Sequence, residues 1–360
     1  MATYKRIEIS QALNVFDDIL DVRSPSEFAD DHVPGAINVP VLNDDERAQI
    51  GTLYAKVSPF EAKKLGATLI ARNIAGHLEA NFSHKPKSWR PLVYCWRGGM
   101  RSGAMAHILA QIGWKTAQLE GGYKAYRRQV IDALDSLPTQ FNFNVICGGT
   151  GSGKSLLLQT LAEQGAQVLD LEALAQHRGS LLGRLPGQAQ PSQKTFETRL
   201  WQALSALTAT RPVYIEAESR KVGVLSLPTA LVARMHASPC IRLEAQQAHR
   251  VQFLIEDYAH FLQNPVLLTE RLSLLVTMHG HAVINRWSEM INSANWGMLV
   301  DDLLTQHYDP AYQRSSDLGR QQLASARVFK LAALNKPCMA QVAIDLISDE
   351  GKFDGGKHNE

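Results

Sequence analysis

The chain has 360 residues, of which 45% are hydrophobic and 20% are charged. That length and apolar content suit about two folded domains and exclude a disordered, collagen-like or small disulfide-stapled protein. The 37 lysines and arginines nearly balance the 35 acids, but the charge is unevenly distributed. Residues 1–50 hold ten acids and four bases, whereas residues 84–128 hold nine bases and one acid. The second segment is therefore a candidate surface for a polyanion.

The sequence shows no apolar run long enough for a membrane span or a secretory signal. We therefore expect a soluble, cytoplasmic protein that has no membrane partner. The cysteines Cys95, Cys147, Cys240 and Cys338 are far apart and form no CxxC pair, which argues against a zinc ribbon or a dithiol redox site. We expect the last three to be buried core thiols.

The first third of the chain alternates short apolar segments with helical patterns. Strands are predicted at Leu20–Val22, Ala36–Val39, Pro91–Tyr94 and Thr116–Leu119, and helices at about Pro59–Leu78 and Ser102–Ile112. Such alternation favours a parallel sheet that is covered by helices. We place this first domain at residues 1–135.

The pattern breaks at Ser136–Thr139 and then resumes. Further strands are predicted at Phe141–Cys147, Ala166–Leu171, Val213–Ala217 and Cys240–Leu243, with helical segments between them. This indicates a second parallel α/β domain at residues 140–245. The sequence from about Ala245 onward is mostly helical, so residues 246–350 are predicted to form a mainly helical extension of that domain.

A cysteine-containing turn follows the predicted strand Pro91–Tyr94. It reads Cys95-Trp96-Arg97-Gly98-Gly99-Met100-Arg101-Ser102, and a helical pattern begins at its end. A thiol at the end of a parallel strand faces converging backbone N–H groups, and the two arginines add positive charge. Such surroundings lower a cysteine pKa from about 8.5 to roughly 3.5–7.5. We predict that Cys95 is a thiolate nucleophile, that Arg101 assists it in catalysis, and that Arg97, Gly98 and Gly99 bind the substrate.

The first domain resembles the rhodanese family. The resemblance rests on Asp21-Val22-Arg23-Ser24-Pro25-Ser26-Glu27-Phe28, on Asp31–Pro40 and on Gly121-Gly122-Tyr123. Asp31 stands where the family usually has glycine. Sulfurtransferase loops place an arginine five residues after the cysteine, whereas Arg101 lies six after Cys95, as in the phosphatase-like branch of the fold. Because a wider ring of N–H donors fits a tetrahedral anion, we hypothesise that the loop accepts a phosphate-bearing chalcogen donor.

A phosphate-binding pattern, G-x-x-x-x-G-K-[ST], occupies Gly148–Ser155 between a predicted strand and a predicted helix at Leu156–Gln164. Glycines let backbone N–H groups approach a diphosphate, and the helix N-terminus adds about half a positive charge. We predict a P-loop in which Lys154 is catalytic and the other seven residues bind the diphosphate: Gly148, Gly149, Thr150, Gly151, Ser152, Gly153 and Ser155.

The acids near this loop suit a nucleotide hydrolase poorly. The segment Pro212–Ser219 offers Glu216 and Glu218 where an aspartate after four apolar residues is expected. Asp170 and Glu216 are predicted to help bind the substrate, and Asp170 could hold Mg²⁺ together with Ser155, although helix capping would also explain these acids. We expect no tightly bound cofactor. Diphosphate binding is indicated, whereas ATP hydrolysis stays open.

Four further blocks accompany the two loops: Asp170-Leu171-Glu172, His177-Arg178-Gly179-Ser180, Glu216…Glu218-Ser219-Arg220 and His307-Tyr308-Asp309-Pro310…Tyr312. With them, essentially the whole chain resembles the bacterial tRNA 2-selenouridine synthases. The resemblance implies a transferase that geranylates the wobble 2-thiouridine of tRNA with geranyl diphosphate. It then replaces the S-geranyl group with selenium from selenophosphate. The P-loop would hold the diphosphate, and Cys95 would handle the selenium donor.

Other features have two interpretations each. Arg178 and Arg220 could clamp a phosphate or the tRNA backbone, or merely solvate the surface. The aromatic residues near the basic segment could stack on anticodon bases or pack in the core; they are Trp89, Trp96, Tyr123 and Tyr126. The apolar stretch Leu267–Val276 could line a prenyl pocket or form an ordinary helix core.

Two other functions compete with the tRNA transferase. One is a rhodanese-type sulfurtransferase coupled to an ATP-dependent kinase or ATPase. The other is a non-catalytic anion sensor that binds nucleic acid, which the intact Cys95 and Lys154 argue against.

Overall fold

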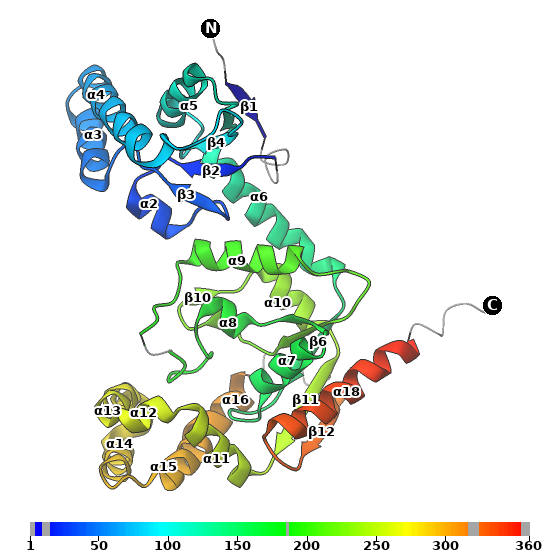
Figure 1. Cartoon of the computed structure of the whole chain (residues 1–360). Coiled ribbons are helices and arrows are strands. Elements are labelled where there is room, and N and C mark those ends of the chain that lie inside the picture. Colours follow the sequence, from blue (N-terminus) through cyan, green and yellow to red (C-terminus); the bar gives the residue numbers. More distant parts are fainter. Residues whose placement is uncertain (1–3, 9–14, 185–186, 316–323, 354–360) are drawn as a thin grey trace. The chain divides into compact units, whose positions relative to one another are not determined.

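The computed structural model of the chain describes residues 4–8, 15–184, 187–315 and 324–353 (Figure 1). The chain divides into two compact units. Unit 1 consists of Met1–Ala133 and Pro191–Thr198, and unit 2 consists of Leu134–Gln190 and Arg199–Glu360. The sequence analysis assigned all of residues 140–245 to the second domain, so the grouping of Pro191–Thr198 with unit 1 differs from that prediction.

Unit 1 is built on a five-stranded sheet in the order β1-β5-β4-β2-β3, in which each described pair of neighbours is parallel. The strands are β1 (Lys5–Ile7), β2 (Asp18–Asp21), β3 (Ala36–Asn38), β4 (Pro91–Tyr94) and β5 (Ala117–Leu119). The central strand β4 is buried along its whole length. The predicted parallel sheet is therefore present. The short edge strand β1 was not predicted, because its three residues are two charged ones and a single apolar one, too few to give a periodic signal.

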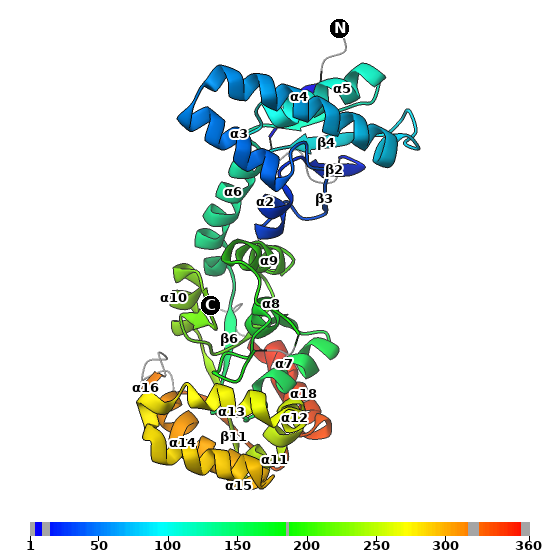
Figure 2. The same ribbon diagram turned by 90° about the vertical axis from the view of Figure 1, so that its left-hand side faces the viewer.

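Helices surround this sheet and close its core. They are α2 (Pro25–Asp30), α3 (Asp44–Lys56), α4 (Pro59–His77), α5 (Met100–Ile112) and α6 (Gly122–Ser136). Figure 2 shows α3 and α4 side by side. Asn43 caps α3 by accepting a hydrogen bond from the Glu46 N–H, and Ser58 caps α4 in the same way. The core packs residues of β2 and β4 against α5, among them Leu20, Val93 and Met105.

Asp31 ties the segment Pro191–Thr198 to the rest of unit 1. Its carboxylate is buried and accepts hydrogen bonds from the Tyr123 hydroxyl at 2.8 Å and the Thr198 hydroxyl at 3.0 Å. Beside it, Lys194 forms an ion pair with Asp30 at 2.5 Å. A buried carboxylate needs such partners, because leaving it unpaired would cost far more than the hydrogen bonds contribute. The departure from glycine at position 31 therefore has a structural reason.

Unit 2 contains a second five-stranded sheet, in the order β12-β11-β6-β8-β7, again with parallel neighbours. The strands are β6 (Phe143–Cys147), β7 (Gln167–Leu169), β8 (Val213–Glu216), β11 (Cys240–Ala245) and β12 (Arg327–Leu331). A small hairpin is formed by β9 (Lys221–Val222) and β10 (Leu225–Ser226). The associated helices are α7 (Lys154–Glu163), α8 (Leu171–Ala175), α9 (Gln193–Ser205), α10 (Thr229–His236) and α18 (Lys336–Phe353).

The helical extension follows β11. It comprises α11 (Gln247–Asp257), α12 (Ala259–Gln263), α13 (Pro265–Ser273), α14 (Val276–Asn292), α15 (Trp296–Leu303), the π-helical turn η3 (Leu304–Tyr308) and α16 (Asp309–Ser315). Helices α12, α13, α14 and α15 share a core around the buried Trp287. None of the helices in the described ranges is long and apolar enough to cross a bilayer.

The predicted extension is mainly helical in the structure, but residues 327–331 add a strand that was not predicted. They form β12, which pairs in parallel with β11, and α18 then packs against α7. The sequence of β12, Arg-Val-Phe-Lys-Leu, is short and only half apolar, so its pattern alone does not distinguish a strand from a helix turn. It becomes an edge strand because it can pair with β11.

Candidate functional site

Cys95 lies at the end of the buried strand β4, where the sequence predicts a reactive thiol. Its Sγ accepts hydrogen bonds from the Gly99 N–H at 3.3 Å and from the Ser102 hydroxyl at 3.1 Å. Gln118, on the neighbouring strand β5, donates to the Ser102 hydroxyl at 2.7 Å and to the Gly99 carbonyl at 3.1 Å. The sulfur thus sits as an acceptor, as a thiolate requires. Ser102 and Gln118 were not predicted as site residues.

The Gly121-Gly122-Tyr123 turn closes around the cysteine loop. The Tyr123 N–H donates to the Cys95 carbonyl at 2.9 Å, and the Lys124 N–H donates to the Trp96 carbonyl at 3.0 Å. Gly122 has φ +58°, and a Cβ placed there would overlap the Cys95 carbonyl and the Gly98 nitrogen. Only glycine fits this position, so the turn fixes the shape of the loop.

Arg101 and Arg97 differ in their surroundings. Arg101 forms an ion pair with Glu27 of α2 at 2.7 Å. Burial raises the pKa of Glu27, but the hydrogen bond and charge of Arg101 outweigh burial and leave that pKa below its ordinary value. Arg97 is exposed. Glu27 was quoted in the sequence motif without a role, and the structure shows that it holds the Arg101 guanidinium.

The basic segment is partly neutralised by acids that lie elsewhere in the sequence. Ion pairs join Lys85 to Asp18, Arg90 to Asp17, Arg101 to Glu27 and Arg127 to Glu197. Three of the four predicted stacking residues, Trp89, Tyr123 and Tyr126, are buried in the core, and only Trp96 is partly exposed. Core packing is therefore the interpretation that holds for those three: Tyr123 and Tyr126 lie on the inward face of α6, and Trp89 packs in the core just before β4.

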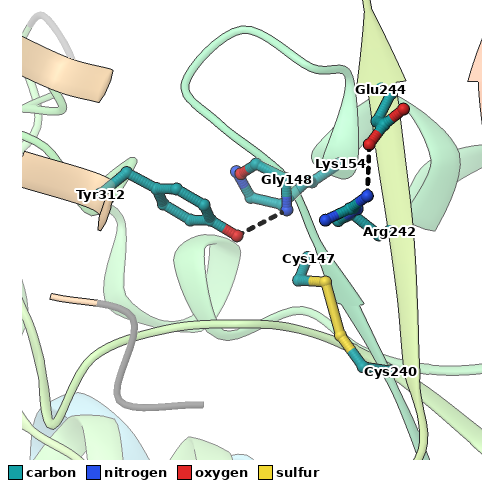
Figure 3. The surroundings of a disulfide bond; sticks show 7 residues. All are labelled: Cys147, Gly148, Lys154, Cys240, Arg242, Glu244 and Tyr312. Carbon is teal, nitrogen blue, oxygen red and sulfur yellow. Dashed lines mark hydrogen bonds and ion pairs between the residues drawn. A yellow bond between two sulfur atoms is a disulfide. The ribbon is translucent and has the colours of Figure 1, made fainter. Parts of the chain in front are cut away.

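The P-loop connects β6 to α7, where the sequence predicts it. The Lys154 ammonium donates to the Gly148 carbonyl at 2.9 Å, and the Gly148 N–H donates to the Tyr312 hydroxyl at 3.0 Å (Figure 3). The Ser152 hydroxyl is buried and has no hydrogen-bond partner within the described ranges. Gly148, Gly151 and Gly153 have positive φ. This is a backbone cradle with donors still to be satisfied.

Residues of the helical extension hold the P-loop from outside. Arg250 of α11 donates to the Thr150 carbonyl at 2.9 Å and pairs with Asp309 of α16 at 2.6 Å. Tyr312 comes from the same helix, α16. Asp309 and Tyr312 occurred in a quoted block without an assigned role, whereas Arg250 had no local signal in the sequence. A guanidinium beside a P-loop is well suited to meet a diphosphate oxygen.

The acids beside the P-loop are arranged differently from the prediction. The Ser155 hydroxyl donates to Glu172 at 3.1 Å, whereas Asp170 caps α8 by accepting the Ala173 N–H at 2.8 Å. Glu216, at the end of β8, is buried and accepts the Glu172 N–H at 2.8 Å. Thus Glu172, and not Asp170, meets the P-loop serine, while Asp170 and Glu216 support α8.

The carboxyl groups on this acidic side of the P-loop have raised pKa values. Burial, then the charges of Asp170 and Glu172, put the pKa of Glu216 well above its ordinary value. Burial and the neighbouring Glu172 raise the pKa of Glu218 to about 8, and burial also raises the pKa of Glu172. Glu172 and Glu218 lie within hydrogen-bonding reach of each other. The pair therefore shares a proton beside Lys154.

The two arginines that follow the strands of unit 2 are not equivalent. Arg178 pairs with Asp257 at 2.5 Å and lies 4.9 Å from the centre of the Tyr258 ring. Arg220 is exposed and lies beside the small hairpin β9–β10. In this structure the Arg178 guanidinium is engaged within unit 2, whereas Arg220 faces solvent.

Two cysteines behave differently from the prediction of free core thiols. Cys147 and Cys240 lie on the adjacent strands β6 and β11 and are joined as a disulfide (Figure 3). Cys338 is a free thiol, but it is only partly buried. The pairing could not be predicted, because 93 residues separate the two cysteines and only the strand order brings them together.

The fold and its two loops define the class of protein: a rhodanese-like domain followed by a P-loop α/β domain with a helical extension. The profile of the rhodanese-like domain matches residues 4–129. The profile described as "tRNA 2-selenouridine synthase AAA domain" matches residues 141–270.

Curated relatives match across both domains. A tRNA 2-selenouridine synthase of Marinobacter nauticus is 37% identical over 70% of this chain and 69% of its own length. Relatives of the same name from Bdellovibrio bacteriovorus and Cupriavidus pinatubonensis are 35% and 34% identical, over 71% and 82% of this chain and 68% and 87% of their own lengths. The chain belongs to the tRNA 2-selenouridine synthase family.

The clash at Gly122 leads to a prediction about the cysteine loop. Gly122→Ala should distort the loop and abolish phosphate binding at it, whereas Gly35→Ala should cost only about 1–2 kcal/mol of stability. Gly35 is the matched control, since its φ is +77° and a Cβ there would meet nothing within 4 Å. Phosphate titration followed by NMR, with urea unfolding alongside, measures both effects. Equal phosphate binding by the two variants would contradict the assignment.

The raised pKa of Glu218 predicts a pH dependence of stability. Between about 4.5 and about 8 the unfolded chain releases this proton while the folded chain keeps it, so the unfolding free energy should fall as the pH rises. Glu218→Gln should remove on the order of 2 kcal/mol of that fall. Urea unfolding at a series of pH values tests this, with the exposed Glu163→Gln as control. A slope unchanged by Glu218→Gln would refute it.

Proposed function

We propose that this protein is a tRNA-modifying transferase of the cytoplasm that works in two steps on the wobble 2-thiouridine. In the first step the sulfur is alkylated by geranyl diphosphate, and in the second the S-geranyl group is replaced by selenium from selenophosphate. Family membership and the names of the relatives support the tRNA substrate and the selenium product. The two anion-binding loops supply one plausible place for each co-substrate.

The first step needs a group that stabilises a leaving diphosphate. The thiocarbonyl sulfur forms a bond to carbon 1 of the geranyl chain as the carbon–oxygen bond to diphosphate breaks. The negative charge that develops on the diphosphate would be met by the P-loop N–H groups and by Lys154. Arg250, 2.9 Å from the Thr150 carbonyl, is placed to add a further positive charge.

The second step needs a site for a phosphate-bearing selenium nucleophile. Selenium forms a bond to carbon 2 of the base, and the S-geranyl group leaves as geranyl thiolate, which takes up a proton. Water then cleaves the selenium–phosphorus bond and releases phosphate. We assign the donor to the Cys95 loop, where the N–H groups and Arg101 would hold its phosphate and the thiol would orient its selenium.

The buried acids beside the P-loop, whose pKa values are raised, support alkyl transfer from geranyl diphosphate over ATP hydrolysis. A nucleotide-hydrolysing P-loop uses an ionised aspartate to hold Mg²⁺. Here the strand next to the P-loop ends in Glu216, which is buried and whose pKa is strongly raised. Displacement of diphosphate from an allylic carbon needs no activated water, so this arrangement suits alkyl transfer. A sulfurtransferase coupled to an ATPase remains the competing function.

Magnesium that arrives with the diphosphate would find two oxygen donors on the protein. They are the Ser155 hydroxyl and the Glu172 carboxyl, which are 3.1 Å apart. Within the described ranges no cluster of three histidine, cysteine or acidic residues could hold a metal by itself. Such a site fits an ion that takes most of its ligands from phosphate and water. We propose no tightly bound cofactor.

Reconstitution with separate variants tests the two steps. Wild-type protein incubated with 2-thiouridine tRNA and geranyl diphosphate should give S-geranyl nucleoside, and selenophosphate should convert it to 2-selenouridine. Lys154→Ala should slow the first step by at least about 100-fold, since a charge is lost where the diphosphate leaves. Cys95→Ala should block the second step and leave the first intact. Nucleoside mass spectrometry measures both products.

The controls for this dissection are Lys64→Ala, an exposed lysine of α4, and Cys338→Ala, the other free cysteine, neither of which belongs to a loop. Both should behave like wild type. Absence of both modified nucleosides with wild-type protein would remove the proposed function, and rapid ATP turnover would favour the ATPase. Intact selenium transfer by Cys95→Ala would overturn the role given to that thiol.

The lysine and arginine side chains of the basic segment that have no acidic partner among the described residues predict where tRNA binds. Lys124 and Arg128 are exposed on one face of α6, and no carboxylate in the described part of the chain pairs with them. Replacing both by alanine should weaken tRNA binding and reduce the salt slope of the affinity by about two. Arg90→Ala is the control, because Arg90 is already paired with Asp17. Filter binding at several salt concentrations measures these slopes. Equal slopes for wild-type protein and the double variant would contradict the prediction.

A further inference from the structure

An apolar cavity lies next to the P-loop within unit 2. It encloses about 570 Å³ of empty space, part of it open to solvent. Its walls are mainly aliphatic and aromatic side chains of the helical extension, including Leu254, Phe261, Trp296, Leu299 and Val300.

The P-loop itself forms one wall of this cavity. Thr150, near the middle of the P-loop, is a lining residue. Leu254 also lines it and lies against the loop, since a Cβ on Gly151 would come within 2.8 Å of the Leu254 side chain. A diphosphate held by the P-loop would therefore have the apolar cavity beside it.

Three polar side chains of the cavity are already engaged with one another. The hydroxyls of Tyr258 and Tyr308 both hydrogen-bond to Ser180. A nucleoside would bring ribose hydroxyls and base nitrogens that need partners, and burying them unpaired is costly. A hydrocarbon chain needs no such partners. The lining thus selects an apolar tail over a nucleoside.

We infer that this cavity is the binding site for the isoprenoid tail of an allylic diphosphate whose head lies in the P-loop. The inference rests on the proposed function. It assigns to the helical extension the choice of an isoprenoid diphosphate over a nucleotide. It also divides the stretch Leu267–Val276, because Leu268 lines the cavity whereas Leu272 and Leu275 pack in the helical core.

The test measures how much the tail contributes to binding. Isothermal titration of wild-type protein should show geranyl diphosphate binding at least about tenfold more tightly than inorganic diphosphate. Val300→Trp, which places an indole in the cavity, should remove that preference and leave the diphosphate affinity unchanged. Trp296→Ala, which removes a wall, should reduce the preference by a smaller factor.

A matched control lies on the same helix. Met298 of α15 is 57% exposed and is not a lining residue, so Met298→Trp adds the same side chain outside the cavity. This variant should bind geranyl diphosphate like wild type. In the transfer reaction, Val300→Trp should lose at least about tenfold more kcat/KM with geranyl diphosphate than with the shorter dimethylallyl diphosphate.

Each outcome separates this inference from the proposed function. If wild type makes the S-geranyl nucleoside but Val300→Trp and Trp296→Ala bind and react like wild type, the tail lies elsewhere and only the cavity assignment falls. If the variants abolish a measured preference for geranyl diphosphate but wild type transfers nothing, the cavity stands and the proposed function falls. No preference over inorganic diphosphate, or tighter binding of ADP, would overturn the cavity assignment.

Discussion

Unpaired backbone N–H groups at the start of a helix attract anions, and both loops of this protein are built on that interaction. In each unit a buried parallel strand, β4 or β6, ends in a glycine-rich loop that leads directly into a helix. The sheet holds the strand, the helix aims its first N–H groups, and the glycines let the backbone approach. The rest of each unit holds the strand, the loop and the helix in position relative to one another.

The two loops use this interaction for different purposes. The loop in unit 1 surrounds a thiol, whose sulfur already accepts two hydrogen bonds and whose nearby Arg101 is held by Glu27. The loop in unit 2 surrounds no nucleophile; its lysine and the adjacent Arg250 offer charge alone. A donor-activating site and a leaving-group site follow from these contents, and they match the two steps proposed for the tRNA base.

Charge in this protein is balanced locally by folding. The acids near the N-terminus pair with part of the basic segment, so the segment is less positive than its sequence suggests. Around the P-loop the opposite occurs: several acids crowd together, and burial and their mutual repulsion raise their pKa values. Burial decides whether an acid forms an ion pair or has a raised pKa. A buried carboxyl without a cation partner favours its neutral form, because water no longer stabilises the charge.

Local patterns predicted much of the fold and of both loops. The strand–loop–helix signature around Gly148–Ser155 and the cysteine turn after Pro91–Tyr94 lie where the sequence placed them. These features depend on neighbours within a few residues, so they can be read directly. Arg250, Tyr312, Glu27 and Gln118 escaped prediction as site residues because each reaches its loop from a distant part of the chain.

The sequence by itself determined the two-domain α/β architecture and the chemistry of the two loops, because strand periodicity, glycine spacing and the helix N-terminus are local properties. Tertiary structure alone decided that Glu172 replaces Asp170 beside Ser155, that Cys147 meets Cys240, and that an apolar cavity borders Thr150. Those outcomes depend on strand order and on how distant helices pack. Packing energies are sums over many weak contacts that no short pattern records.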